Sequence, residues 1–312
     1  MAEFEALSQD IYCIDALYMN PGVASIYLLR GGDEVALVET GTCHSLPNVL
    51  DTMEALGIDS AQVKYVIPTH VHLDHAGGAG AMMQQFDQAE LLIHARGANH
   101  MIDPQRLVAG TIGVYGEEKF ERLYGRIEPI AEQRVVVADD LAKFSLGNRE
   151  LVFFDTPGHA RHHFCIYDEL SEGVFTGDTF GISYTSMKKL PRGLIPTTPP
   201  NQFDPPELRR SVARIMEFEP RRLYLTHYGE FENPGAQVDS FNRWIDQYVD
   251  ISHRYDSESV ELERELEDDL THSILDALCD AENGPELQRI LRNDINLDAQ
   301  GLAHWRRNNA HG

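Results

Sequence analysis

The sequence predicts an α/β fold followed by a helical extension. Short apolar runs rich in β-branched residues alternate with segments of helical spacing through about the first 233 residues. From Gln237 onward only helical periodicity remains. We therefore expect an α/β domain over residues 1–233 and a C-terminal α-helical extension over residues 234–312 that packs on it.

Turn residues and apolar runs define the elements of the first half. Gly31-Gly32-Asp33 is a hairpin signature between two β-rich runs, and Gly57 closes a segment of helical spacing. A third apolar run stops directly at Pro68-Thr69-His70. We expect strands over residues 23–29, 35–38, 63–67 and 91–93, and helices over residues 46–56 and 79–86.

The second half repeats this style. Residues 96–134 are more polar and helical, and form either an insertion that leans over a site or a plain packing pair of helices. Residues 181–206 hold many prolines, which predicts a long loop of the kind that is usually functional. We expect strands over residues 135–137, 141–144, 151–154, 164–167, 174–176 and 223–225, and helices over residues 208–218, from 237 onward and over 285–308.

Charge and cysteine content limit the class of protein. The formal net charge is −24, and such a surface repels nucleic-acid backbones and anionic lipid. The four cysteines form no CxxC pair, which predicts a reduced, cytoplasmic protein without a disulfide framework. No apolar stretch approaches 18 residues. We expect a small-molecule substrate, no nucleic-acid or membrane partner, and leave a homodimer open.

Candidate metal ligands follow the predicted strands. Ligands at the ends of several strands converge on one edge of a sheet, where α/β sites form. The 14 histidines and 24 aspartates make a chance HxHxDH run rare. The candidates are His70, His72, Asp74 and His75 in that run, followed along the chain by His159, Asp178 and His227.

The spacing of these residues predicts two metal sites. His70 and His72 are two apart, so on an extended segment both face one metal. Asp74 and His75 follow where the chain bends into a helix, and can turn toward a second metal. We expect His159 to complete the first site, His227 to complete the second, and Asp178 to bridge them. Imidazole and carboxylate ligands suit zinc as the default, with iron or manganese as alternatives.

Two neighbouring metals predict hydrolytic chemistry. Two divalent ions about 3.5–4 Å apart can share a water, lower its pKa and so supply a bridging hydroxide nucleophile at neutral pH. Asp74 can take the proton that turnover releases. Tyr184 and Tyr228 are candidate donors to a developing oxyanion.

The full set of motifs resembles the metallo-β-lactamase superfamily. His70–His75 with Gly77-Gly78, Thr156–His159, Thr176–Thr179 and Thr226-His227 carry the resemblance, over about residues 10–233. It implies a four-layer αββα sandwich whose catalytic domain is residues 1–233, and the seven-ligand set resembles glyoxalase II, quorum-signal lactonases and related esterases. True β-lactamases generally lack the bridging aspartate. Where the family usually has an aspartate at a strand end, this chain has Glu39, which could orient a ligand histidine.

The leading functional hypothesis is therefore hydrolysis of an ester, thioester or lactone by a dinuclear metal enzyme. An iron-dependent redox enzyme acting on oxygen or a persulfide is the first alternative on the same site. A small-molecule phosphodiesterase is the second, since the negative charge disfavours nucleic acid. We expect substrate specificity to be determined by residues 96–134, residues 181–206 and the helical tail. No known sequence pattern predicts a substrate from such segments.

Overall fold

The computed structural model of this chain describes residues 4–188, 190, 193–278 and 284–309. They form two compact units, each assembled from three segments: Met1–Asp155, His162–Gly177 and Glu219–Glu232 in the first, and Thr156–Arg161, Asp178–Phe218 and Asn233–Gly312 in the second. The chain passes from the first unit to the second for the last time between Glu232 and Asn233, next to the predicted boundary. The division into a domain of residues 1–233 and an extension of residues 234–312 stays a prediction.

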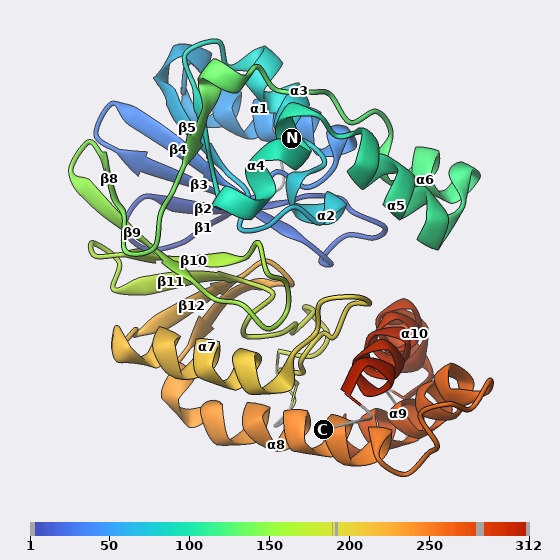
Figure 1. Cartoon of the computed structure of the whole chain (residues 1–312). Coiled ribbons are helices and arrows are strands. Elements are labelled where there is room, and N and C mark those ends of the chain that lie inside the picture. The colour runs from blue at the N-terminus through green and yellow to red at the C-terminus, as the bar shows by residue number, and fades with distance from the viewer. Residues whose placement is uncertain (1–3, 189, 191–192, 279–283, 310–312) are drawn as a thin grey trace. The chain divides into compact units, whose positions relative to one another are not determined.

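The first unit is built on two β-sheets (Figure 1). Seven strands of one sheet lie in chain order, with antiparallel pairing from β1 to β4 and parallel pairing from β4 to β7. Gly32, with a positive φ of 64°, makes the predicted tight turn between β3 and β4. The strands are β1 (Phe4–Ala6), β2 (Ile11–Asp15), β3 (Ser25–Gly31), β4 (Glu34–Val38), β5 (Val63–Ile67), β6 (Glu90–Ile93) and β7 (Val135–Val137).

The second sheet of this unit has six strands in the order β13-β12-β11-β10-β9-β8. Its one parallel pair joins β11 and β12. The strands are β8 (Lys143–Leu146), β9 (Arg149–Asp155), β10 (Phe164–Asp168), β11 (Gly173–Gly177), β12 (Arg222–Leu225) and β13 (Gly229–Glu232). The parallel pairs β4–β5 and β11–β12 direct the carboxyl ends of their strands to one side of each sheet, where the candidate ligands follow.

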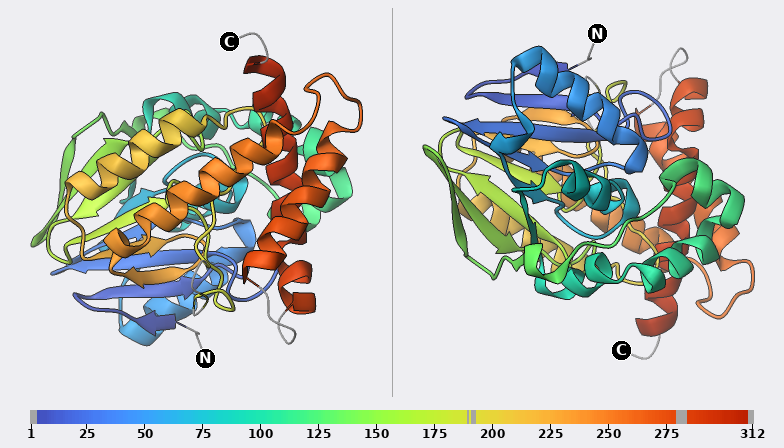
Figure 2. Two further views of the ribbon diagram at one scale, coloured as in Figure 1. Left: turned by 90° about the horizontal axis from the view of Figure 1, so that it is seen from below. Right: turned by 90° about the horizontal axis from the view of Figure 1, so that it is seen from above.

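Two apolar layers hold the first unit together. Alternate residues of both sheets meet in a buried core, which includes Tyr27, Val38, Phe153 and Phe175. A second buried cluster lies between the other face of the first sheet and its helices, of which Figure 2 shows α1 over the blue strands. The helices of this unit are α1 (Leu46–Leu56), α2 (Leu73–Ala76), α3 (Ala79–Gln85), α4 (Ala95–Ile102), α5 (Gln105–Tyr115) and α6 (Glu117–Tyr124).

The second unit is helical. It contains α7 (Pro205–Glu217), α8 (Val238–Ser252), α9 (Leu262–Leu278) and α10 (Gly284–Asn309), together with the loop that precedes α7. Buried leucines and isoleucines recur every four residues in α9, as a helix packed along one face requires. Helix α7 begins three residues before the expected start, because Asp204 accepts from the Glu207 amide and Pro205 occupies the first turn.

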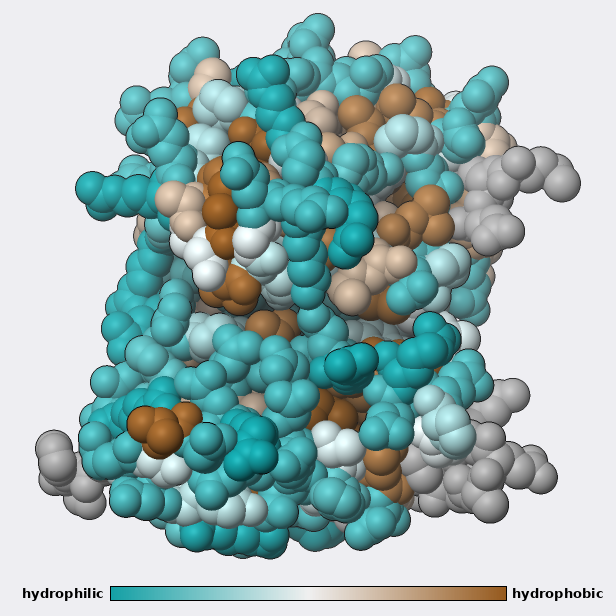
Figure 3. All heavy atoms as spheres, turned by 90° about the vertical axis from the view of Figure 1, so that its right-hand side faces the viewer, coloured by the Kyte–Doolittle hydropathy of each residue, from teal (hydrophilic) through white to brown (hydrophobic). Residues whose placement is uncertain are grey.

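The prediction of an α/β fold with C-terminal helices is confirmed. The proline-rich stretch of residues 181–206 carries no helix or strand before α7 in its described part, which leaves out residues 189, 191 and 192. No helix in the described ranges is long and apolar enough to cross a membrane. On the face in Figure 3 hydrophilic side chains predominate, in keeping with the charge of −24.

Candidate metal centre

Three predicted ligands of the first unit converge in space. Asp74, His75 and His227 each offer one ligand atom, and these atoms all lie within 4.8 Å of one another. The Oδ2 atom of Asp74 is 3.7 Å from Nε2 of His75 and 3.5 Å from Nε2 of His227. Asp74 and His75 belong to α2, and His227 lies two residues after the end of β12. The group predicted for the second metal is therefore assembled within one compact unit.

The hydrogen-bond partners of the two histidines show which ring nitrogens are available to a metal. The Nδ1 atom of His227 lies 2.7 Å from the carbonyl oxygen of Val23, and Nδ1 of His75 lies 3.0 Å from Oε1 of Glu39. Carbonyl and carboxylate oxygens accept hydrogen bonds, so each Nδ1 carries the proton. Each Nε2 is then an unprotonated ligand nitrogen directed at the Asp74 carboxylate. This donor set fits a divalent zinc, iron or manganese ion.

Glu39 is the centre of a buried hydrogen-bond network. Only 1% of its surface is exposed, and its backbone has a positive φ of 69°, a strained value for a residue other than glycine. Its carboxylate accepts from the amide and the hydroxyl of Thr69, at 3.1 and 2.6 Å, from the Thr226 hydroxyl at 2.8 Å, and from His75. The glutamate thus takes the orienting role that the family resemblance assigns to an aspartate.

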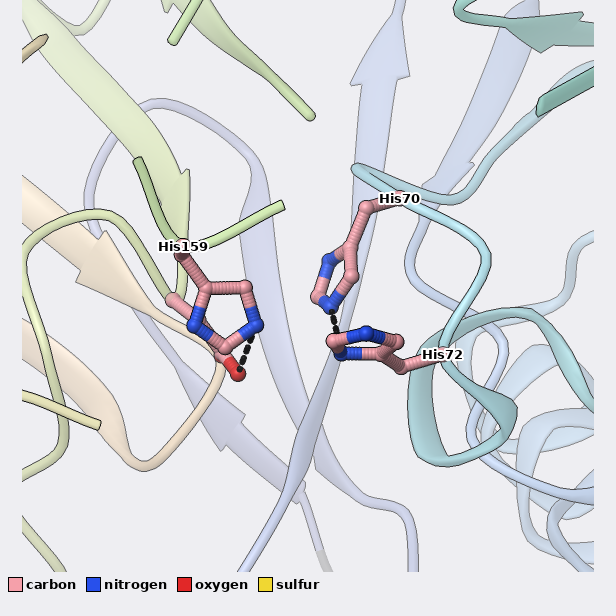
Figure 4. A group of neighbouring side chains, drawn as sticks. His70, His72 and His159 are labelled. Atoms are coloured by element: carbon pink, nitrogen blue, oxygen red, sulfur yellow. Dashed lines mark hydrogen bonds and ion pairs between the residues drawn. The ribbon is translucent and has the colours of Figure 1, made fainter. Parts of the chain in front are cut away.

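The same network reaches His70. The Thr69 hydroxyl donates to Glu39, so it accepts from Nδ1 of His70, 3.1 Å away. Nε2 of His70 is left as the ligand nitrogen and lies 2.8 Å from Nδ1 of His72. Figure 4 shows the two rings turned toward each other. His70 and His72 therefore direct one ring nitrogen each toward the same point, as their spacing predicts.

Two further histidines brace this segment. His163 is buried and stacks on His70 with ring centroids 4.8 Å apart. His162 accepts from the amide of Val71 at 3.4 Å, and burial, followed by the neighbouring His72, lowers its pKa to about 3. His162 therefore stays neutral near pH 7 and adds no positive charge beside the ligands. A Cβ at Gly177 would lie 2.4 Å from His163 and 2.5 Å from Thr69, so this position requires glycine.

The remaining predicted ligands, His159 and Asp178, lie in the second unit and form a pair there. Nε2 of His159 is 3.3 Å from Oδ2 of Asp178, and both side chains are more than nine-tenths buried. Nδ1 of His159 lies 3.4 Å from the carbonyl oxygen of Thr197, so Nε2 is again the ligand nitrogen. Figure 4 also shows the ring of His159. That His159 completes the first site and Asp178 bridges two metals stays a prediction.

The structure also places the predicted tyrosines and the helical insertion. The Tyr184 hydroxyl donates to Oδ1 of Asp294 at 2.9 Å, and Tyr228 packs against the core between the sheets. Burial raises the pKa of Tyr124 above its ordinary value, and the neighbouring Tyr18, followed by the negative charge of Asp74, raises it further. Helix α6 packs its buried Phe120 and Tyr124 into the core cluster of the first unit, and a role of residues 96–134 over the site stays a prediction.

Sequence reasoning did not find the atoms that orient the ligands. A backbone carbonyl such as that of Val23 leaves no trace in a side-chain pattern. Thr69 and Thr226 were visible, since each directly precedes a ligand histidine, and a hydroxyl beside a metal ligand is a usable signal of a hydrogen-bonded second layer.

Comparison with known proteins identifies the family. The model of the metallo-beta-lactamase superfamily matches residues 19–227, so the chain belongs to that superfamily. A solved structure of an archaeal superfamily protein from Sulfolobus tokodaii superposes with a TM-score of 0.66 over 95% of this chain and 99% of that chain, at 21% identity. This likeness shows the fold, and the predicted metallo-β-lactamase sandwich is confirmed. The expectation of a metal-dependent hydrolase of this superfamily is confirmed at that level.

Curated relatives show slightly higher identity, over shorter parts of this chain. A metallo-beta-lactamase fold-containing protein of Sulfurisphaera tokodaii is 26% identical over 215 residues, 67% of this chain and 74% of the relative. An acyl-coenzyme A thioesterase of Bos taurus is 28% identical over 191 residues, 56% of this chain and 64% of the relative. An atrochrysone carboxyl ACP thioesterase of Aspergillus fumigatus is 24% identical over 261 residues, 81% of this chain and 65% of the relative. The matches span less than two thirds of both thioesterases.

Proposed function

We propose that this chain is a dinuclear metal hydrolase that cleaves an acyl thioester, within the wider class of esters, thioesters and lactones. The observation that carries the proposal is the convergence of Asp74, His75 and His227, with both imidazoles oriented by hydrogen bonds at Nδ1. Such oriented, deprotonated donors suit a metal site better than a structural cluster. The two thioesterases among the relatives favour a thioester over the other acyl compounds.

In this proposal His70, His72 and His159 hold one divalent ion, Asp74, His75 and His227 hold the other, and Asp178 bridges them. Zinc is the default metal, and iron or manganese fit the same donors. Two bound ions would lower the pKa of a water between them toward neutrality and polarise the substrate carbonyl. His75 is fully buried, and Glu39 keeps its Nε2 atom in position through the hydrogen bond at Nδ1.

Asp74 is the proposed proton acceptor. Its side chain is 21% exposed, whereas His75 beside it is fully buried, so Asp74 can pass a proton from the site to solvent. Tyr184 and Tyr228 are proposed oxyanion donors, and replacement of each by phenylalanine tests them. A fall in kcat of about 10²-fold at unchanged metal content supports the residue concerned. An unchanged kcat removes that residue from the proposal.

A panel of substrates tests the proposal. Purified protein is assayed with an acyl thioester, a lactone and a small phosphodiester, with H72A and D178A as controls. We expect the highest kcat/KM for the thioester and no turnover by either variant. Preferred phosphodiester cleavage would contradict acyl hydrolysis. Bound iron with oxygen uptake and no hydrolysis would instead support the redox alternative.

A further inference from the structure

We propose that Asp298 in the C-terminal helix α10 is a positioning residue for the ligand His159, and acts through the peptide group between Thr197 and Thr198. The inference rests on the proposed function, because it assigns His159 to a metal. All four residues belong to the second unit. The inference gives the helical tail a part in the metal centre that no motif of the sequence indicates.

The first step is the hydrogen bond of His159. Its Nδ1 atom donates to the carbonyl oxygen of Thr197 at 3.4 Å, which is longer than the 2.7 Å bond that orients His227. A long hydrogen bond restrains a ring weakly. The orientation of His159 therefore depends on how firmly the Thr197 carbonyl is itself held.

The second step is that this carbonyl is held from its other end. The amide of Thr198 belongs to the same peptide group, and it donates to Oδ1 of Asp298 at 2.6 Å. The Thr198 hydroxyl donates to the backbone oxygen of Asp298 at 3.0 Å and lies 3.2 Å from its Oδ1. A peptide group is planar, so fixing the direction of its N–H fixes the direction of its C=O. Donation to Asp298 also makes the carbonyl a stronger acceptor for His159.

The third step concerns Asp298 itself. It is 1% exposed, and burial raises the pKa of its carboxyl well above the ordinary value. Oδ1 can accept from the Thr198 amide whether or not the other oxygen carries a proton. The bond therefore needs the oxygen atom and not the charge, and asparagine can replace it.

Close contact between α10 and the loop completes the arrangement. A Cβ at Gly301 would lie 1.8 Å from the Thr198 carbonyl oxygen, so only glycine allows the helix to approach this closely. On the loop side, Pro196 and Pro199 flank the two threonines, and proline restricts both itself and the residue before it. The peptide is thus held between a stiff loop and a buried helix.

The test is a titration of the metal-free full-length protein with Zn²⁺ by calorimetry, with H159A used to identify the binding step that needs His159. D298L keeps the branching of the side chain, is larger than aspartate, and removes the acceptor. We expect it to weaken that step about 10–100-fold and leave the other step unchanged. D298N, which keeps an acceptor oxygen, should stay within about threefold of the wild type.

Two variants separate positioning from stability. L291A removes a buried side chain of the same helix and should leave both steps unchanged. G301A favours the helix but pushes it from Thr198, so it should weaken the His159 step, and it replaces D298L if that variant does not fold. Unchanged binding in D298L, or equal weakening of both steps in D298L and L291A, overturns the inference. A wild-type protein that binds no Zn²⁺ overturns the proposed function instead.

Discussion

The two units hold their ligand histidines by different means. In the first unit His75 and His227 follow strand ends and are anchored at 3.0 and 2.7 Å by a buried carboxylate and a strand-adjacent carbonyl. In the second unit His159 has a 3.4 Å bond to a loop carbonyl, and that loop is held by a helix far along the chain. The sheets supply rigid anchors directly, whereas the helical unit has to stiffen a loop first.

We expect the largest loss of activity when a ligand histidine is removed from either unit, which tests whether catalysis needs both units. H75A in the first unit and H159A in the second should each lower kcat/KM by about 10³-fold or more, because each removes a ligand of the proposed metals. Steady-state kinetics with a thioester measures this. H272A, a change of an exposed histidine on α9, should leave kcat/KM unchanged. Near-normal activity of H159A would show that the second unit takes no part in catalysis.

The next effect concerns the anchor of the first unit. E39A leaves the partners of a buried carboxylate unsatisfied and should lower the free energy of unfolding by about 3–5 kcal/mol, with loss of bound metal. Chemical denaturation and elemental analysis measure the two results. D168A is the matched control, since Asp168 is a buried carboxylate 2.5 Å from Arg149. It should lower stability and keep the metal, and equal metal loss in both variants would contradict a specific role for Glu39.

A smaller effect isolates one donor to Glu39. T226V keeps the shape of the side chain and removes the hydroxyl that donates to Glu39 at 2.8 Å. We expect a loss of about 1–3 kcal/mol in the free energy of unfolding and weaker metal binding than in the wild type. T52V removes a buried hydroxyl that bonds within its own helix and should change neither metal affinity nor activity. Wild-type metal affinity in T226V would show that the Thr226 hydroxyl does not help Glu39 to orient the metal ligand His75.

The smallest effect lies at the exposed edge of the first unit. The Glu34 carboxylate is 2.8 Å from Lys64, and this hydrogen bond lowers the pKa of Glu34. Because the pKa of Glu34 is lower in the folded state, its ionised carboxylate stabilises the fold at pH values above the ordinary carboxyl pKa. This stabilisation is lost as the pH falls through the pKa of the folded state. E34Q should therefore cost less than about 1 kcal/mol at pH 7, and the difference from the wild type should shrink below pH 4. A difference that grows in acid would contradict this sign.

The same contrast explains what the sequence could predict. The HxHxDH run and His227 follow apolar strands, so periodicity and spacing predict that they converge, and Asp74, His75 and His227 lie together in the structure. Glu39 stands out in the sequence as a departure from a family motif, but its contacts depend on the exact direction of a strained backbone. No sequence pattern marks Asp298, because it lies on α10, about 140 residues after His159, and its role passes through a peptide group. Strands β1, β2 and β13 are not predicted either, since such short segments carry little periodic signal.

We propose above all that this chain binds two catalytic metal ions and that both units contribute ligands. Elemental analysis of the purified protein, combined with thioester turnover before and after chelation, tests it most directly. We predict two metal ions per chain, loss of turnover on chelation and recovery on metal addition, with neither property retained in H72A or D178A. A native protein without metal, to which added metal gives no turnover that these two substitutions abolish, would contradict the account.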